Sequence, residues 1–460
     1  MVYDVLVLGA GPAGWAAALQ AAKLGLHVGV IEKDSRFGGA CVHTGTLPSK
    51  TLRHTILELV AAHRVARVGL HTRSLRPLTI QDLMGPSEAV VEAHERTIRA
   101  FFERNGVEVL AGSASFVRPD RVRVASADAE REIEARNVII ATGSRPRRPE
   151  AIPFDDRAVC DSDSLLGLDA IPRRFLVLGG GVIGCEYACM FAALGSRVTL
   201  IDRRRELLRF VDQDLVDTLK QSMRRSGIRL MLGEELAEIC IESGGRGPAA
   251  CLTLSGGRRA RGDRLLVAAG RESCTAALDL ERIGIACAPS GEIKVDEHHR
   301  TEVPGVYAVG DVIGFPALAS TSMHQGRLAV LHAAGWPLPP ASPLPLALYT
   351  IPEISSVGRS EEECRAEGIG YEVGYARYAE TPRGQILGDE DGLLKLVFRR
   401  EDRRILGVHL IGQNSSELVH TGLTLLQLGG TLEDILAAVY NYPTLSEAYR
   451  IAALDGVNRL

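Results

Sequence analysis

The chain of 460 residues carries one glycine-rich unit twice, and an offset of 170 residues relates Gly9 of the first copy to Gly179 of the second. Each copy begins with a short apolar strand, passes through Gly-x-Gly-x-x-Gly into a helix, and closes on a second strand that ends in an acidic residue. The glycines are Gly9, Gly11 and Gly14 in the first copy and Gly179, Gly181 and Gly184 in the second, and the acidic residues are Glu32 and Asp202. Because one offset relates all these positions, the sequence predicts two dinucleotide-binding units.

The three glycines of each copy have distinct tasks. The first makes a tight turn, the second lets the backbone approach a pyrophosphate, and the third lets the helix pack closely on the strand. Glu32 follows Gly9 by 23 residues, so its carboxylate is placed to accept hydrogen bonds from ribose hydroxyls. A single motif of this kind is a weak signal, but its repetition makes a chance match implausible.

Two further segments fit the first dinucleotide site. An apolar strand is followed by Thr142 and Gly143, and a later strand over residues 306–309 leads into Gly310 and Asp311. Either segment alone is typical of an ordinary strand end and turn. Together with the motif of residues 38–50, they resemble the pattern of flavoproteins with two dinucleotide sites, which implies that the Asp311 carboxylate can hold the sugar-alcohol chain of a flavin.

Composition limits the partners of the chain. A formal net charge of -4 gives no long-range attraction for nucleic acid or anionic lipid. The uncharged run from residue 5 to residue 22 is interrupted by glycines and Pro12, so we expect a strand, turn and helix there and no membrane span. Nine cysteines, an odd number without the spacing of a small disulfide domain, predict a reduced, cytoplasmic protein. Cys185 and Cys189 share a helix face without further ligands at metal-binding spacing, so no metal site is expected.

Two more motifs complete the pattern. Residues 38–50 read GGACVHTGTLPSK, and the motif Tyr-Pro-Thr-Leu-Ser-Glu begins at Tyr442. With them, nearly the whole chain resembles the FAD-dependent pyridine nucleotide-disulfide oxidoreductases of class I. In that family NAD(P)H reduces the flavin on one face and a disulfide takes the electrons from the other. The resemblance places Cys41 and Thr46 at the two cysteine positions and Tyr442 at the position of an acid-base histidine.

The resemblance implies an α/β architecture with two Rossmann-like dinucleotide-binding domains, for FAD and for NAD(P), and an α+β C-terminal dimerisation domain. A proline-rich stretch over residues 336–345 cannot continue a helix and indicates the linker into that last domain. The expected segments are residues 1–150 for the first part of the FAD domain, 151–272 for the NAD(P) domain, 273–340 for the second part of the FAD domain, and 341–460 for the C-terminal domain. A homodimer or a larger homo-oligomer is the implied assembly.

Two departures from the family pattern concern the chemistry. Threonine has no accessible redox couple, so Thr46 leaves Cys41 without a local disulfide partner. Tyrosine, with an ordinary pKa of about 10, is seldom a base near neutral pH, so Tyr442 does not replace the histidine. Both departures resemble a branch of the family that exchanges hydride between NAD(H) and NADP(H) through FAD. The implied cycle is ping-pong and uses one flavin face for both nucleotides.

The resemblance also implies roles for single residues. Lys50 and Glu186 are expected to form an ion pair beside flavin N5, with a plain structural salt bridge as the alternative. Cys41 and Lys50 also belong to the expected FAD site, and Glu186 to the NAD(P) site. The remaining expected contacts are Gly39 and Ala319 for FAD and Gly270 for NAD(P).

The ribose pocket of the second unit carries charges of both signs. Asp202 suits the 2′-hydroxyl of NAD and repels a 2′-phosphate, whereas Arg203, Arg204 or Arg205 can pair with the 2′-phosphate of NADP. The alternative is that these arginines form an exposed turn. The sequence therefore favours use of both nicotinamide nucleotides.

Two other functions stay open at this point. A reductase of quinones or other diffusible acceptors also needs no disulfide. A flavoprotein that senses nucleotides without turnover is the third possibility, although such a protein would not require the Lys50 and Glu186 pair.

Overall fold

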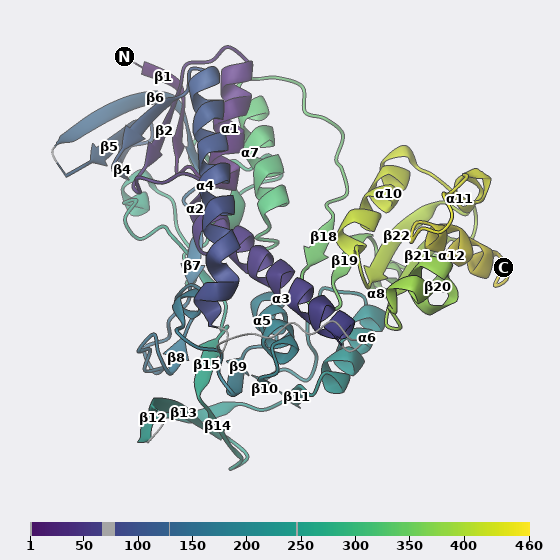
Figure 1. Cartoon of the computed structure of the whole chain (residues 1–460). Helices are drawn as coiled ribbons and strands as arrows, with labels where there is room; N and C mark the ends of the chain where they lie inside the picture. The colour runs from purple at the N-terminus through teal and green to yellow at the C-terminus, as the bar shows by residue number, and fades with distance from the viewer. Residues whose placement is uncertain (1, 67–78, 128, 245–246) are drawn as a thin grey trace. The chain divides into compact units, whose positions relative to one another are not determined.

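The structure is a computed structural model and describes residues 2–66, 79–127, 129–244 and 247–460 (Figure 1). The chain divides into two compact units. The first is made of Met1–Ile152, Asp161–Ala170 and Ala269–Pro340, and the second of Pro153–Cys160, Ile171–Ala268 and Ala341–Leu460. Strands and helices are mixed in both units, which confirms the predicted α/β class. The second unit combines segments that the sequence assigns to the NAD(P) and C-terminal domains, so the four-segment division stays a prediction.

A seven-stranded sheet forms the centre of the first unit. Its strand order is β3-β2-β1-β6-β5-β4, and β17 pairs with β6. The helices and strands of this unit are β1 (Val2–Leu8), α1 (Pro12–Lys23), β2 (Val28–Glu32), α2 (Gly39–His43), α3 (Thr46–Ala66), α4 (Ile80–Arg104), β3 (Glu108–Ala111), β4 (Ser113–Arg118), β5 (Arg121–Ala125), β6 (Glu130–Ile140), β7 (Ser144–Pro146), β16 (Arg271–Ser273), β17 (Val306–Ala308) and α7 (Ala319–Ala333), with short 3₁₀ helices η1 (Ser164–Gly167), η2 (Leu280–Ile283) and η3 (Gly310–Ile313).

The parallel strands of this sheet end at one common edge. β1 pairs in parallel with β2 and β6, with Leu8 opposite Ile31 and Ile140. β17 pairs in parallel with β6, with Ala308 also opposite Ile140. The segments that follow β1, β6 and β17 therefore meet at the carboxyl edge, where open α/β sheets bind their ligands.

Small residues let α1 and α7 pack directly on each other. A Cβ built on Gly326 of α7 would lie 2.2 Å from the carbonyl oxygen of Ala13 in α1, so a side chain cannot replace glycine without moving a helix. This contact sets the two helices side by side over the sheet (Figure 1). Within the described ranges, no helix combines the length and apolar character that crossing a bilayer requires.

The second unit contains three sheets. A parallel sheet has the order β11-β10-β9-β15-β8, a small antiparallel sheet the order β12-β13-β14, and a larger antiparallel sheet the order β18-β19-β22-β21-β20. The elements are β8 (Val159–Cys160), β9 (Arg174–Leu178), α5 (Val182–Ala193), β10 (Arg197–Asp202), α6 (Gln213–Arg225), β11 (Arg229–Leu232), β12 (Leu236–Gly244), β13 (Gly247–Leu254), β14 (Arg259–Gly262), β15 (Arg264–Val267), β18 (Leu346–Leu348), β19 (Ile354–Gly358), α8 (Glu361–Ala366), β20 (Tyr371–Arg377), η4 (Tyr378–Glu380), α9 (Pro382–Leu387), β21 (Leu393–Arg399), β22 (Ile405–Ile411), α10 (Ser415–Leu428), α11 (Leu432–Ala437) and α12 (Glu447–Val457).

Helices α10 and α12 are fastened to the larger antiparallel sheet and to each other. A Cβ on Gly374 of β20 would lie 2.0 Å from the carbonyl oxygen of Ala452 in α12. The buried Tyr449 of α12 donates its hydroxyl to the carbonyl of Leu418 at 2.7 Å and accepts the backbone N–H of Gly422 at 3.0 Å. These contacts confirm the predicted α+β character of the C-terminal part.

A buried ion cluster connects β21 to the starts of α6 and α8. The ammonium of Lys395 lies 2.9 Å from Asp212, 2.7 Å from Asp214 and 2.6 Å from Glu361, and its side chain is 1% exposed. Burial acts to lower the pKa of Lys395, but the three carboxylates outweigh burial and raise it. The lysine therefore stays charged inside the unit.

Lys395→Met leaves three carboxylates without their cation. We expect the free energy of unfolding to fall by ~3–5 kcal/mol, because breaking a buried pair leaves uncompensated charge. The measurement is the midpoint of thermal or urea unfolding of the purified protein. Arg403→Met is the control, because its pair with Glu433 is 46% and 53% exposed and contributes less than ~1 kcal/mol. Equal shifts for the two variants would contradict the prediction.

Candidate active site

The first glycine-rich turn joins β1 to α1 at the carboxyl edge of the sheet. Gly9 has a φ of +105°, and a Cβ on Gly14 would lie 1.9 Å from the Gly9 carbonyl oxygen, so both positions require glycine. A Cβ on Gly11 would meet no atom of the described residues within 4 Å. Gly9 and Gly14 thus serve backbone packing, whereas the space before Gly11 can take a ligand.

Glu32 is tied to this turn. Its carboxylate is buried and accepts the backbone N–H of Ala10 at 2.7 Å and that of Asp34 at 3.0 Å. Carboxylate oxygens have further acceptor sites, so Glu32 can also take ribose hydroxyls. Gly39 lies against the same turn, because a Cβ there would be 3.1 Å from the Cα of Gly11.

Thr142 and Asp311 lie at the same edge of the sheet. The Thr142 hydroxyl is buried and has no hydrogen-bond partner in the part of the chain that the structure describes. Ser144 donates to Asp311 at 2.8 Å, and Arg271 donates to the Ser144 hydroxyl at 2.7 Å. The sequence did not point to Ser144 or Arg271, because only the pairing of β7 with β16 brings them to Asp311.

The other predicted flavin residues occupy turns and a helix start. Gly143 and Gly310 have φ values of +70° and +78°, which favour glycine. A Cβ on Gly310 would lie 3.0 Å from the Cβ of Ala13, so this turn packs against α1. Ala319 is the first residue of α7, whose N-terminus carries no side-chain cap among the described residues. Its backbone N–H groups are therefore open to an acceptor.

Cys41 and Thr46 face each other across the loop between α2 and α3. The Thr46 side chain is a hydrogen-bonding neighbour of the Cys41 thiol, and Cys41 is a free cysteine. Burial raises the pKa of this thiol and outweighs the lowering by Thr46 and Lys50. The structure thus brings the two predicted positions together and leaves Cys41 a protonated thiol near neutral pH.

Lys50 and His43 flank this loop. Lys50 is half-buried and lies four residues, about one helical turn, after Thr46 on α3. The Nε2 atom of His43 lies 2.8 Å from the carbonyl oxygen of Phe37, so this nitrogen carries the proton and donates. This contact favours a structural role for His43.

The second glycine-rich turn repeats the first. Gly179 has a φ of +115°, and a Cβ on Gly184 would lie 1.8 Å from its carbonyl oxygen. A Cβ on Gly181 would again meet none of the described atoms within 4 Å. Gly180 donates its N–H to Asp202, as Ala10 does to Glu32. The repeat seen in the sequence is therefore a repeat in geometry.

Arg204 is held on Asp202 by three hydrogen bonds. Its backbone N–H and Nε donate to one carboxylate oxygen at 2.7 and 3.1 Å, and its Nη2 donates to the other at 3.0 Å. Burial acts to raise the pKa of Asp202, but the hydrogen bonds from Arg204 outweigh it and lower the pKa. Arg204 therefore neutralises the acid that ends β10, while Arg203 is exposed.

Glu186 lies on α5 and is buried. It accepts the backbone N–H of Tyr349 at 2.8 Å, a partner for which the sequence offers no local signal. Lys50 belongs to the first unit and Glu186 to the second, and their predicted ion pair stays a prediction. Gly270, with a φ of +98°, belongs to the first unit and accepts the N–H of Arg147 at 3.1 Å. Its role in nucleotide binding also stays a prediction.

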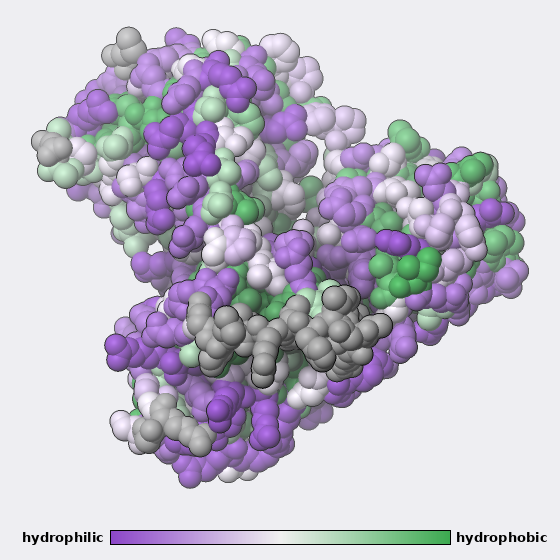
Figure 2. All heavy atoms as spheres, viewed as in Figure 1, coloured by the Kyte–Doolittle hydropathy of each residue, from purple (hydrophilic) through white to green (hydrophobic). Residues whose placement is uncertain are grey.

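Tyr442 stands on the surface of the C-terminal part and is 72% exposed. The following residues 443–446 line a hollow together with Arg383, Asn414 and Glu417. Glu447 has one carboxylate oxygen that is buried and without a hydrogen-bond partner in the described ranges. Figure 2 shows hydrophobic residues on the surface in the region of α10 and α11. Leu428, the last residue of α10, is 80% exposed, and Val439, which follows α11, is 99% exposed.

Fold and site together define a flavoprotein that uses pyridine nucleotides. Residues 3–326 match the family described as pyridine nucleotide-disulphide oxidoreductase, and residues 344–453 match its dimerisation domain. The chain belongs to this family of FAD-dependent oxidoreductases, which confirms the resemblance found in the sequence.

Several relatives match over the full length. The chain is 42% identical to the soluble pyridine nucleotide transhydrogenase of Mycobacterium bovis and 39% identical to that of Photobacterium profundum, in each case over 100% of this chain and 98% of the relative. The crystal structure of LpdA from Mycobacterium tuberculosis is similar with a TM-score of 0.90 and 28% identity, over 98% of this chain and 99% of that chain. The HOCl-induced flavoprotein disulfide reductase RclA from Escherichia coli is similar with a TM-score of 0.85 and 26% identity, over 98% and 99%.

The first unit fits FAD. A ligand rich in hydroxyl and phosphate groups needs hydrogen-bond partners and room for a pyrophosphate at a helix start. The unpartnered hydroxyl of Thr142 and the open space at Gly11 meet both needs. Glu32, Gly39 and Asp311 lie around these two features at the carboxyl edge.

Gly11→Ala adds a methyl group in the space before the turn, where it meets no atom within 4 Å among the described residues other than its chain neighbours. We expect the protein to fold and the FAD retained after gel filtration to fall at least ~10-fold, because a methyl group blocks the approach of the pyrophosphate. Gly85→Ala in α4 is the control, since its added Cβ also meets no atom within 4 Å among the described residues beyond its own stretch of helix. Equal flavin content in the wild type and both variants would contradict this prediction.

Proposed function

We propose that the protein is a FAD-dependent NAD(P) transhydrogenase, which moves hydride from NADPH or NADH to the oxidised form of the other nucleotide. The observation that carries this proposal is the pairing of Cys41 with the Thr46 hydroxyl. A hydroxyl cannot form a disulfide, so this loop contains no disulfide that could accept electrons from the flavin. The names of the full-length relatives support the same activity.

The residues of the FAD site have distinct roles in the proposed reaction. FAD, when bound, supplies the group that accepts hydride and returns it. The glycine turn with Glu32, Thr142 and Asp311 orients that group. Lys50 would supply a positive charge that stabilises the reduced state of the bound flavin. Hydride carries both electrons, so a tyrosine at the position of the family's acid-base histidine does not impair the reaction.

The NAD(P) site accepts two nucleotides because the charge of Asp202 is balanced. An unpaired carboxylate at the end of β10 would repel the 2′-phosphate of NADP. Arg204 removes that repulsion, and the exposed Arg203 adds a cation for the phosphate. The Asp202 oxygens still accept a hydrogen bond from the 2′-hydroxyl of NAD.

We infer a homodimer, or a larger homo-oligomer, in the cytoplasm. The match to a dimerisation domain and the exposed apolar residues Leu428 and Val439 support association through the C-terminal domain. The nine cysteines, all in the described ranges, are free thiols, as a reducing compartment allows. The four-segment division at residues 150, 272 and 340 is part of this proposal.

Anaerobic half-reactions test the activity. Either NADPH or NADH should bleach the flavin absorbance of the purified protein, and NAD or NADP of the other kind should restore it. Reoxidation by a quinone but by neither nucleotide would contradict the proposal and favour a quinone reductase. Absence of bleaching by both nucleotides would favour a nucleotide-sensing flavoprotein instead.

Arg204→Ala tests the balance of charge at the ribose pocket. We expect the KM for NADPH to rise at least ~10-fold, because Asp202 then repels the 2′-phosphate and a charge-assisted contact is lost. The KM for NADH should change much less. Arg205→Ala is the control, since the Arg205 side chain lies against Gly233. A steady-state comparison in which both nucleotides are affected equally would contradict this role.

A further inference from the structure

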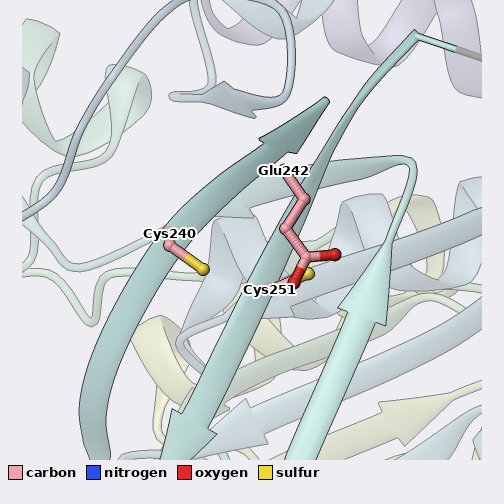
Figure 3. Close-up of side chains that lie close together, drawn as sticks. All are labelled: Cys240, Glu242 and Cys251. Carbon is pink, nitrogen blue, oxygen red and sulfur yellow. The ribbon is translucent and has the colours of Figure 1, made fainter. Parts of the chain in front are cut away.

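Two cysteines and a glutamate converge on the hairpin of β12 and β13. Cys240 lies directly opposite Cys251, so antiparallel pairing puts both side chains on one face. Glu242 follows Cys240 by two residues and therefore projects from the same face. The two sulfur atoms and a carboxylate oxygen all lie within 4.8 Å of one another, and Figure 3 shows the three side chains pointing toward a common centre.

The neighbours of this triad leave it room and access. The residue opposite Glu242 is Ala249, whose methyl group allows the longer side chain to lean toward Cys251. Cys240 is exposed, the Glu242 side chain is 43% exposed, and Cys251 is only 6% exposed. An ion can thus enter from solvent at Cys240 and reach the buried thiol of Cys251.

An arginine on the third strand of this sheet offsets the negative charge of the cluster. Arg261 lies opposite Cys251 on β14, and its Nε donates to Glu242 at 3.2 Å. Two thiolates and a carboxylate carry one negative charge more than a divalent cation cancels, and Arg261 offsets that charge. The arginine also satisfies the carboxylate when no ion is bound.

We propose that Cys240, Glu242 and Cys251 bind a zinc ion, with water or an external donor as the fourth ligand. Two sulfurs with one oxygen suit zinc, whereas calcium and magnesium take oxygen ligands. Tetrahedral zinc with Zn–S distances of ~2.3 Å needs the two sulfurs ~3.8 Å apart, which the present spacing reaches by small side-chain rotations. Both thiols release their protons to solvent on binding.

The expectation of no metal site, which the structure does not test, did not consider these residues. It rested on ligand spacing along the chain at Cys185 and Cys189. The new triad combines two residues of β12 with one of β13, and only the strand register places Cys251 beside Cys240. The bound ion would tie the two strands of the hairpin together.

Zinc binding to the reduced, FAD-loaded full-length protein tests the site. Competition with a chromophoric chelator should give one zinc ion per chain, and cobalt as a probe should give a thiolate-to-cobalt charge-transfer band. We expect Cys240→Ser and Glu242→Gln each to weaken zinc binding at least ~10-fold. Cys287→Ser, which removes an exposed cysteine outside the triad, should leave binding unchanged.

Three results would overturn the proposal. The first is zinc affinity that is the same in Cys240→Ser and wild type. The second is cobalt binding without the charge-transfer band. The third is a sample that loses two thiols to a Cys240–Cys251 disulfide under air and, after reduction, binds no zinc, which would assign the pair to disulfide chemistry. Transhydrogenase activity is not needed for any of these readouts, so they stand apart from the proposed function.

Discussion

Both nucleotide-binding units depend on a helix that starts directly on the carbonyl group of a glycine turn. A Cβ at Gly14 or Gly184 would lie 1.9 or 1.8 Å from that oxygen, so no side chain fits between strand and helix. The close start aims the first backbone N–H groups of the helix at the carboxyl edge of the sheet. Glu32 and Asp202 then accept N–H groups from within the turn, which fixes turn and acid relative to each other. The same contacts therefore hold the fold together and shape the ligand site.

The first unit has the flavin-site segments that are typical of its family, but it lacks the second cysteine of the redox disulfide. Thr142 and Asp311 reach the edge because β6 and β17 run parallel to β1. At the loop beside them, burial keeps Cys41 a neutral thiol, and its neighbour Thr46 offers a hydroxyl in place of sulfur. A flavin bound beside this loop would find no disulfide there to take its electrons. The loss of one sulfur thus restricts the chemistry without disturbing the fold.

Charge compensation recurs through the second unit. Asp202 is balanced by Arg204, Lys395 is balanced by three carboxylates, and Glu242 is balanced by Arg261. In the first case we propose that the balance lets the ribose pocket accept a phosphate, and in the second it stabilises the joint between α6 and β21. In the third it holds a carboxylate beside two thiols. In each case a charged side chain lies against a side chain of opposite charge, supplied by another element or by a nearby turn.

The sequence alone determined the fold class, the two glycine turns, the flavin segments and the exchange of a cysteine for Thr46. These features are local, because strand period, glycine conformation and the spacing from turn to acid act within a few tens of residues. The tertiary structure decided which partner each charged or polar group meets. Ser144 and Arg271 reach Asp311 through the pairing of β7 with β16, Tyr349 reaches Glu186 across more than a hundred residues, and strand register aligns Cys240 with Cys251. Register and packing between distant segments depend on the whole folded chain, so residue spacing along the sequence does not predict these contacts.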